Sequence, residues 1–325
     1  MAADSSLRGL QRLLSDVVPG GRATAATSEG GSIEAMTSAV DPPRLIAAAV
    51  IEGSTVRARA VSGTPQPEFS GFLDGTQTSQ VLHHVDGVPV IRGVVAAVVR
   101  VRRDRRMSTW RQVSLTQVYA PLTLLSSTWK RALELLPVPV VDTTVDEGSA
   151  VIEHPYALRD SAIHAVQRAR EQLEQKLAVE WCNEMRERLF VDGGISGSDK
   201  VASEACVVGV VKTHRTLYAE GDALRTILRL KMGERSSVLR VTSPKRATVA
   251  SWYLRMRDPA GYDPMWGLVR VEVSHTAAAD ITERADEVSR WILAEATPVA
   301  LPDARWDKMV YGIRDCEEFL RAISA

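Results

Sequence analysis

Two short segments of the chain each end an apolar run with Asp followed by Gly. Asp74-Gly75 closes the run that begins at Phe69, and Asp192-Gly193 closes the run that begins at Leu189. An apolar run of this kind predicts a buried strand, so each carboxylate is expected where a strand emerges from the core. The glycines let the chain turn and let a group such as a phosphate approach the backbone closely.

Two such strands in one sheet would bring Asp74 and Asp192 together. Neighbouring carboxylates repel each other unless a positive charge lies between them, and divalent cations prefer oxygen ligands. The two aspartates therefore outline a metal-dependent site that cleaves phosphodiesters.

The bulk composition is that of a soluble globular protein. The 325 residues are 45% hydrophobic and 25% charged, and Lys plus Arg equals Asp plus Glu at 40 each. Neutrality counts against strong independent binding of nucleic acid, and it is compatible with a nuclease that receives DNA from a partner. We find no signal peptide and no apolar stretch long enough to span a membrane.

The three cysteines, Cys182, Cys206 and Cys316, have no paired spacing. This scatter argues against a disulfide framework and against a zinc site, and it suits a reducing cytoplasm, where we expect the protein.

The order of expected elements positions the aspartates. A short amphipathic helix (6–18) and a flexible linker form an N-terminal region, 1–40, and the helix either packs on the domain 41–325 or docks another subunit. Strands follow at 69–74, 88–103 and 111–119, then a helix at 156–188 and a strand at 189–192. Further strands are expected at 205–212, 237–242, 248–257 and 267–274, with helices at 221–230, 280–296 and 305–323.

A three-stranded meander followed by a helix and a further strand is the ribonuclease H-like arrangement. We therefore predict an α/β fold with a ribonuclease H-like mixed sheet flanked by helices. In that arrangement the first strand, the long helix and the fourth strand each supply a metal-binding carboxylate. On the helix, Glu174 lies at the edge of the apolar stripe, Glu180 lies inside it, and Glu171 points nearly opposite, as expected of a solvated charge.

The sequence resembles the NurA nuclease family, the partner of HerA-type hexameric DNA translocases. The similarity covers about residues 65–320. Its motifs are Asp-Gly-Thr at 74–76, Arg-Glu-Gln-Leu-Glu at 170–174, Phe-Val-Asp-Gly-Gly at 190–194 and Val-Val-Gly-Val-Val-Lys at 207–212, with the paired stretches 252–255 and 267–272.

The resemblance implies a metal-dependent deoxyribonuclease that acts on single-stranded DNA and DNA ends, in end processing, repair or phage defence. It also implies a homodimer docked on a HerA-like hexameric ATPase. The resemblance further implies that Asp74, Asp192 and the helical Glu174 hold two Mn²⁺ or Mg²⁺ ions, and Glu180 is the alternative to Glu174 as the third carboxylate ligand. Lys212, at a strand end, is either a contact to a DNA phosphate or an ordinary surface lysine.

The sequence departs from the family at its C-terminal end, where Arg305 occupies the position of a family histidine. Arginine cannot ligate a metal, but it can hold a phosphate, and Asp307 or Asp303 could supply the missing ligand. This departure keeps open a second reading, a catalytically weak or inactive adaptor subunit of a translocase complex. The basic run 100–106 is either a contact to DNA or, as we prefer, the solvated tip of a hairpin.

Overall fold

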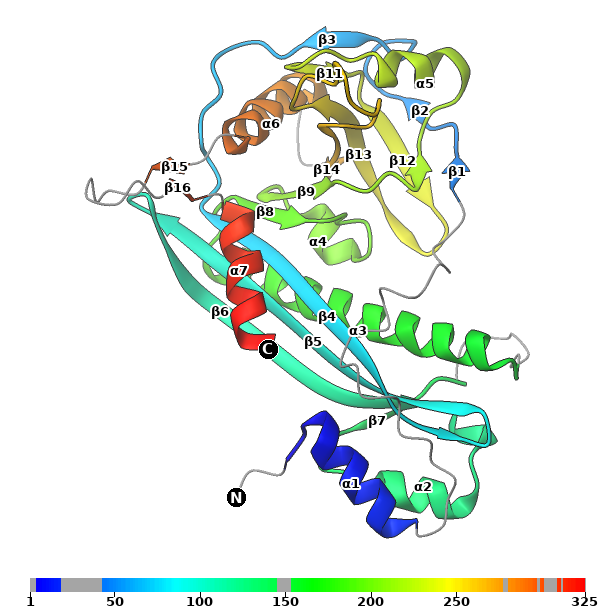
Figure 1. Cartoon of the computed structure of the whole chain (residues 1–325). Coiled ribbons are helices and arrows are strands. Elements are labelled where there is room, and N and C mark those ends of the chain that lie inside the picture. The colour runs from blue at the N-terminus through cyan, green and yellow to red at the C-terminus, as the bar shows by residue number, and fades with distance from the viewer. Residues whose placement is uncertain are drawn as a thin grey trace.

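The computed structural model describes residues 4–18, 43–144, 153–276, 280–296, 299–300, 309–310 and 312–324. Its centre is a sheet in the order β6-β5-β4-β8-β9. In this order β5 runs antiparallel to β4 and β6, whereas β8 is parallel to both β4 and β9. This is the ribonuclease H-like arrangement that the sequence predicts (Figure 1). The bounds are β4 (Gly71–Val85), β5 (Val88–Arg103), β6 (Arg106–Ala120), β8 (Leu189–Asp192) and β9 (Val207–Val211).

The same sheet continues on both sides of this centre to twelve strands. Next to β9 come β14 (Leu268–Ser274), β13 (Arg246–Arg255), β12 (Leu239–Ser243) and β2 (Ala49–Val50), with β11 (Glu234–Ser236) and β3 (Ala58–Ala60) off the main path. At the other edge β7 (Val140–Asp142) pairs with β6. The small sheets pair β1 (Arg44–Leu45) with β10 (Thr216–Leu217) and β15 (Val299–Ala300) with β16 (Met309–Val310).

Helices α3 (Pro155–Glu184) and α7 (Gly312–Ser324) cover opposite faces of the long strands (Figure 1). On β4, Leu73 packs in one buried cluster with Leu177 of α3, whereas its neighbour Phe72 packs in another with Cys316 of α7. Successive strand side chains point to opposite faces, which explains the division. The other helices are α1 (Leu7–Val17), α2 (Ser127–Glu134), α4 (Asp199–Ser203), α5 (Gly221–Leu228), α6 (Ile281–Glu295) and the 3₁₀ turn η2 (Leu122–Leu124).

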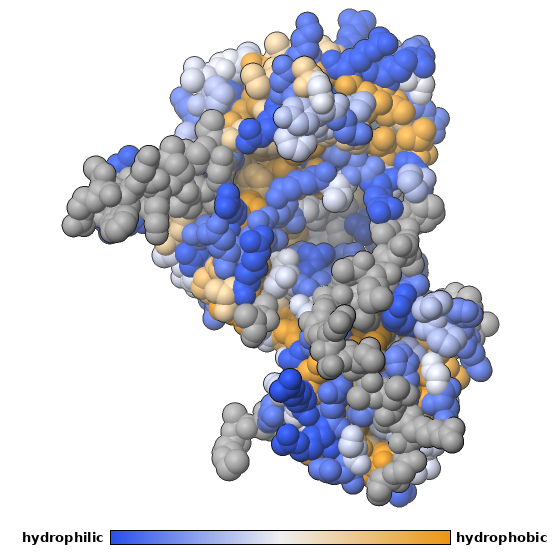
Figure 2. Space-filling view, viewed as in Figure 1, coloured by the Kyte–Doolittle hydropathy of each residue, from blue (hydrophilic) through white to orange (hydrophobic). Residues whose placement is uncertain are grey.

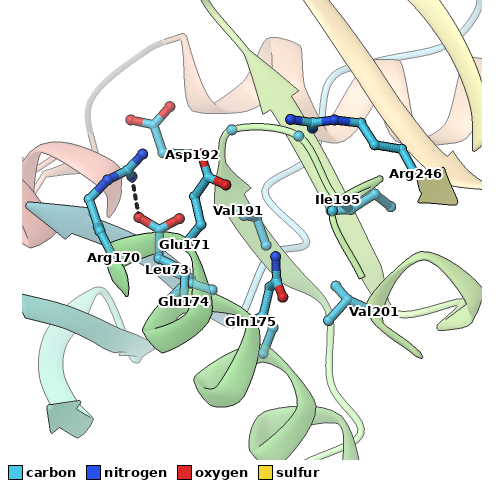
Figure 3. Close-up of a pocket in the computed structure, with 14 residues that line it drawn as sticks. Leu73, Arg170, Glu171, Glu174, Gln175, Val191, Asp192, Ile195, Val201 and Arg246 are labelled. Atoms are coloured by element: carbon cyan, nitrogen blue, oxygen red, sulfur yellow. Dashed lines mark hydrogen bonds and ion pairs between the residues drawn. The ribbon is translucent and has the colours of Figure 1, made fainter. Parts of the chain in front are cut away.

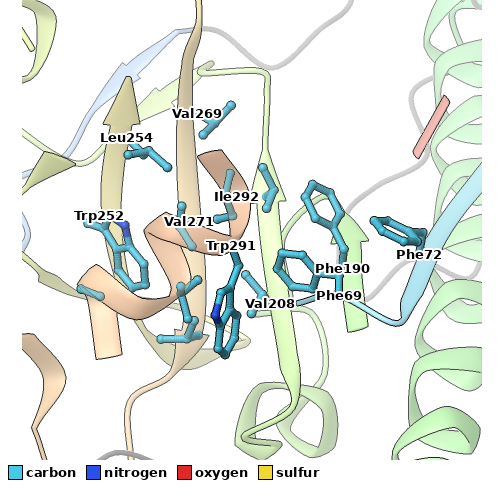
Figure 4. Close-up of a cluster of buried hydrophobic side chains, with 14 of the residues drawn as sticks. Phe69, Phe72, Phe190, Val208, Trp252, Leu254, Val269, Val271, Trp291 and Ile292 are labelled. Atoms are coloured by element: carbon cyan, nitrogen blue, oxygen red, sulfur yellow. The ribbon is translucent and has the colours of Figure 1, made fainter. Parts of the chain in front are cut away.

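An aromatic cluster joins the two halves of the sheet (Figure 4). The ring of Phe69 lies 5.2 Å from that of Phe190 and 5.8 Å from that of Trp291 on α6, measured between centroids. Because β4, β8 and α6 all contribute to this cluster, the strand pair that carries both aspartates is anchored in the main core.

The N-terminal helix packs on the domain, which confirms the first of the two alternatives for it. Leu10 and Leu14 of α1 are fully buried in a cluster with Leu82 of β4 and Trp129 of α2. Ser6 caps the helix by accepting a hydrogen bond from the Gly9 amide at 3.1 Å. Helix α2 and strand β7 were not expected from the sequence. The expected linker, 19–38, lies outside the described residues.

Two expectations about the strands are wrong. First, β4 does not end at Asp74: it continues to Val85, because its polar half is hydrogen-bonded along β5. Second, the basic run is solvated only at its tip: residues 103–106 are exposed, whereas the side chains of Arg100 and Arg102 are only 14% and 10% exposed. They form ion pairs with Asp315 of α7, which packs on β5, and with Glu295, the last residue of α6.

Candidate metal centre

Strands β4 and β8 place the two aspartates side by side. Leu73 is opposite Val191 in the parallel register, and each aspartate is the next residue of its strand. Asp74 lies inside β4, but β8 ends at Asp192, so β4 loses this neighbour at the level of Asp74. The two aspartates therefore lie at the point where the sheet opens, that is, where β8 ends and β4 continues without it. By strand alternation both carboxylates are on the face that α7 covers.

A third carboxylate comes from α7. One oxygen each of Asp74, Asp192 and Glu317 lie within 4.8 Å of one another. Helix α7 is held on β4 by the Cys316 thiol, which donates to the Phe72 carbonyl at 3.3 Å, and by Gly312, whose missing Cβ leaves room for the Phe72 ring. We call Asp74, Asp192 and Glu317 the carboxylate triad.

The triad fits a hard divalent cation. Two oxygens bound to one ion at about 2.1 to 2.3 Å lie at most about 4.6 Å apart, so small side-chain rotations would bring all three to bonding distance. Burial raises the pKa of Asp74 to about 6, and the charge of Asp192 adds to the rise. A half-buried carboxylate beside two others is costly unless a positive charge lies among them, which makes the three residues a candidate metal site.

Lys212 is the cation that the structure places against the triad. Its Nζ lies 2.7 Å from Asp192 Oδ2, and its side chain is 49% exposed. It follows β9, which pairs with β8 in parallel and ends one residue before Lys212. The lysine is thus close enough to the carboxylates to reach a phosphate bound at them.

Glu174 lies beside Asp74 but on the face of α3. Its carboxylate fills the space that a side chain at position 75 would occupy, and it forms an ion pair with Arg170 (Figure 3). Burial raises the pKa of Glu174 to about 7; Arg170 opposes the rise, and Asp74 adds to it. Glu174 and Asp192 line the same pocket.

The other two helical glutamates also have clear positions. Glu180 points to β6, where its carboxylate lies 2.7 Å from Arg111. Glu171 is half-buried and lines the pocket beside Glu174 (Figure 3). It accepts a hydrogen bond from Gln167 at 2.9 Å.

The turn after Asp192 is fixed by a buried carboxylate on β14. Glu272, 1% exposed, accepts hydrogen bonds from the amides of Ile195 at 2.8 Å and Ser196 at 3.3 Å, and it forms an ion pair with Arg270. Gly193 starts the turn with φ of +141°, a conformation that favours glycine. Glu272 therefore positions the chain that follows a candidate ligand.

Sequence reasoning missed Glu317 and Glu272. Glu317 borders the apolar stripe of Cys316 and Leu320 on its helix, the same kind of signal that drew attention to Glu174. No pattern distinguishes Glu272 in a strand. Arg305, Asp303 and Asp307 lie outside the described residues.

Comparison with solved structures finds a similarity of fold. The chain aligns with the crystal structure of the NurA nuclease from Sulfolobus solfataricus at a TM-score of 0.44 and 10% sequence identity, over 84% of this chain and 81% of that one. No protein-family model and no curated protein matches the sequence. The fold assignment stands on the strand order, and this likeness adds neither a site residue nor an activity to it. Among the helices that the structure describes, none is long and apolar enough to cross a membrane.

Proposed function

We propose that the chain is a divalent-metal-dependent DNA nuclease, a phosphodiester hydrolase. The observation that carries the proposal is the carboxylate triad: three elements far apart in sequence converge their oxygens within 4.8 Å where the sheet opens. The resemblance of the motifs to those of the NurA family directs the proposal to single-stranded DNA and DNA ends. An RNA-directed or Holliday-junction nuclease of the same fold would differ from it in substrate preference.

Asp74, Asp192 and Glu317 would hold one Mn²⁺ or Mg²⁺ ion, and Glu174 would contribute to a second from the neighbouring pocket. Bound there, such ions supply Lewis-acid stabilisation of the phosphoryl charge and lower the pKa of a coordinated water. The role of the protein would be to hold the carboxylates in place through β4, β8 and α7. Lys212 would leave Asp192 to bind a phosphate oxygen of the DNA.

A nuclease assay with matched variants tests the triad. Single-stranded and blunt duplex DNA are incubated with Mn²⁺ and the wild type, Asp74→Asn, Asp192→Asn or Glu317→Gln. Each variant should cut at least roughly 100-fold more slowly, because a lost ligand weakens ion placement. Glu318→Gln is the control: it changes the next residue of α7, which is 60% exposed and pairs with Arg314. Full nuclease activity in Glu317→Gln would show that Glu317 is not a metal ligand.

The finer parts of the proposal rest on the motif resemblance. They are a cytoplasmic homodimer, docking on a HerA-like hexameric translocase, a role in DNA end processing, repair or phage defence, and phosphate binding by Arg305. The division into an N-terminal region, 1–40, and a nuclease domain, 41–325, is likewise proposed. Co-purification with a translocase encoded nearby, followed by light scattering of the complex, tests the assembly.

A catalytically inactive adaptor is the second candidate, and two ion pairs favour it. Lys212 neutralises Asp192, and Arg170 neutralises Glu174, so these carboxylates have internal partners. An adaptor would bind the translocase and show no metal-dependent cutting alone or in the complex. A nuclease would lose its cutting in the triad variants.

A further inference from the structure

Two cysteines that are 24 residues apart in sequence meet in the fold. The Sγ atoms of Cys182, near the end of α3, and Cys206, just before β9, lie 3.5 Å apart. The meeting follows from the chain path, because β8 begins beside the start of β9 and the Leu189 amide donates to the Cys206 carbonyl at 2.9 Å. All three cysteines are free thiols in the structure, and their spacing in the sequence does not show that two of them meet.

The two thiols differ in access and in ionisation. Cys182 is buried, whereas Cys206 is only half-buried. The hydrogen bond between them lowers the pKa of Cys206 and raises that of Cys182, and nearby Arg284 adds to the lowering for Cys206. The more accessible sulfur is thus the one that more readily becomes a thiolate, the reactive form of cysteine.

We propose that Cys182 and Cys206 form a modification site, which a low-molecular-weight disulfide such as oxidised glutathione converts to an intramolecular disulfide. The Cys206 thiolate attacks one glutathione sulfur, which forms a mixed disulfide and releases one glutathione thiolate. Cys182 then loses its proton and attacks the Cys206 sulfur, which releases the second glutathione. The two cysteines are oxidised, one glutathione disulfide is reduced to two thiols, and the two cysteine protons end on those thiols.

The bond would enclose the segment that carries part of the carboxylate triad. Residues 183–205 contain β8 with Asp192, the turn that Glu272 fixes and α4. Closing this segment would tie the end of α3, the helix of Glu174, to the start of β9 and would restrict the unfolded chain. The oxidised protein should therefore unfold at a higher temperature than the reduced one.

A metal ion is the competing occupant of these sulfurs. A carboxylate oxygen of Glu204 lies within 4.8 Å of both. A structural zinc site takes four protein ligands, and within the described ranges only three such groups meet here. The side chains of Lys200 and Arg284 also act on the two thiols as positive charges. These positive charges would repel a bound cation, whereas the Glu204 carboxylate acts on both thiols with the opposite sign.

The test uses the full-length chain, reduced and then incubated with oxidised glutathione. Free thiols are alkylated in denaturant, and intact mass is measured. The expected product carries one alkyl group, on Cys316 as internal control, whereas the reduced protein carries three; without alkylation the oxidised chain is about 2 Da lighter. Dithiothreitol should restore all three thiols and lower the unfolding temperature again. Cys182→Ser should stop at the glutathione adduct, about 305 Da heavier, and Cys206→Ser should remain unmodified.

Three results would overturn the proposal. One is a wild type that keeps three free thiols in oxidised glutathione. Another is a wild-type mixed disulfide that persists without resolving. The third is a pair of thiols that reacts only after treatment with a chelator, because protection of this kind identifies a metal site instead.

Discussion

Replacing Asp74 with asparagine should stabilise the metal-free protein at neutral pH, although it removes a candidate ligand. Burial raises the pKa of Asp74 from 3.8 to about 6, with Asp192 as the second cause, so the fold disfavours the ionised carboxylate. One pKa unit corresponds to about 1.4 kcal/mol, which makes ionised Asp74 a cost of up to about 3 kcal/mol above pH 7. Asparagine has nearly the same shape and no charge, so the cost disappears.

The pH dependence has a defined sign. Below about pH 4, Asp74 is protonated in the folded and unfolded states, and its ionisation costs nothing. The cost grows as the pH rises from about 4 to about 6 and is constant above that. Between pH 5 and pH 8 the free energy of unfolding of the wild type should therefore fall by about 1 to 2 kcal/mol relative to that of Asp74→Asn.

Urea unfolding in the presence of a chelator measures this difference at both pH values. Asp222→Asn is the control, because its carboxylate on α5 is 94% exposed and its pH profile should follow the wild type. Added Mn²⁺ should then stabilise the wild type and leave Asp74→Asn almost unchanged. If Asp74→Asn has the pH dependence of the wild type, or is less stable than the wild type at pH 8, ionised Asp74 does not destabilise the fold.

Two further substitutions examine the surroundings of the triad. Gly75→Ala should displace the carboxylate of Glu174 and weaken Mn²⁺ binding, measured by calorimetry, by roughly tenfold. Gly93→Ala is the control. Its new methyl group clashes with the Tyr119 ring, so it should lower the free energy of unfolding by about 1 to 3 kcal/mol without changing Mn²⁺ affinity. Glu272→Gln leaves a buried guanidinium without its carboxylate and should lower the free energy of unfolding by about 3 kcal/mol in urea, so a loss below about 1 kcal/mol would contradict its role.

The elements with strong local patterns could be predicted from sequence. Strand β8 has the predicted bounds, β5 does as well, and α3 begins one residue before its predicted start. Apolar β-branched runs and the helical stripe specify these elements without help from the rest of the chain. The predicted end of β4, at Asp74, was wrong because the second half of this strand is polar. That half is a strand only because it pairs with β5.

The site was only half predictable for the same reason. Each aspartate follows an apolar run that marks its own strand, so local sequence indicates where it lies. Glu317 lies beside the two aspartates only because α7 packs on β4. The contact between these elements joins Cys316 and Phe72, which are 244 residues apart in the sequence. Likewise, no local spacing shows that the thiols of Cys182 and Cys206 meet. Contacts of this range depend on the complete fold.

Strand alternation decides which helix completes the carboxylate triad. Phe72 and Asp74 of β4 face α7, whereas Leu73 and Gly75 face α3. The helix predicted to supply the third carboxylate therefore meets Gly75, and the last helix of the chain meets Asp74. A shift of one residue in the β4 register would turn Asp74 toward α3 and separate it from the other two members of the triad. The pairing of β4 with β5 on one side and β8 on the other fixes this register, so the long sheet and the triad depend on the same hydrogen bonds.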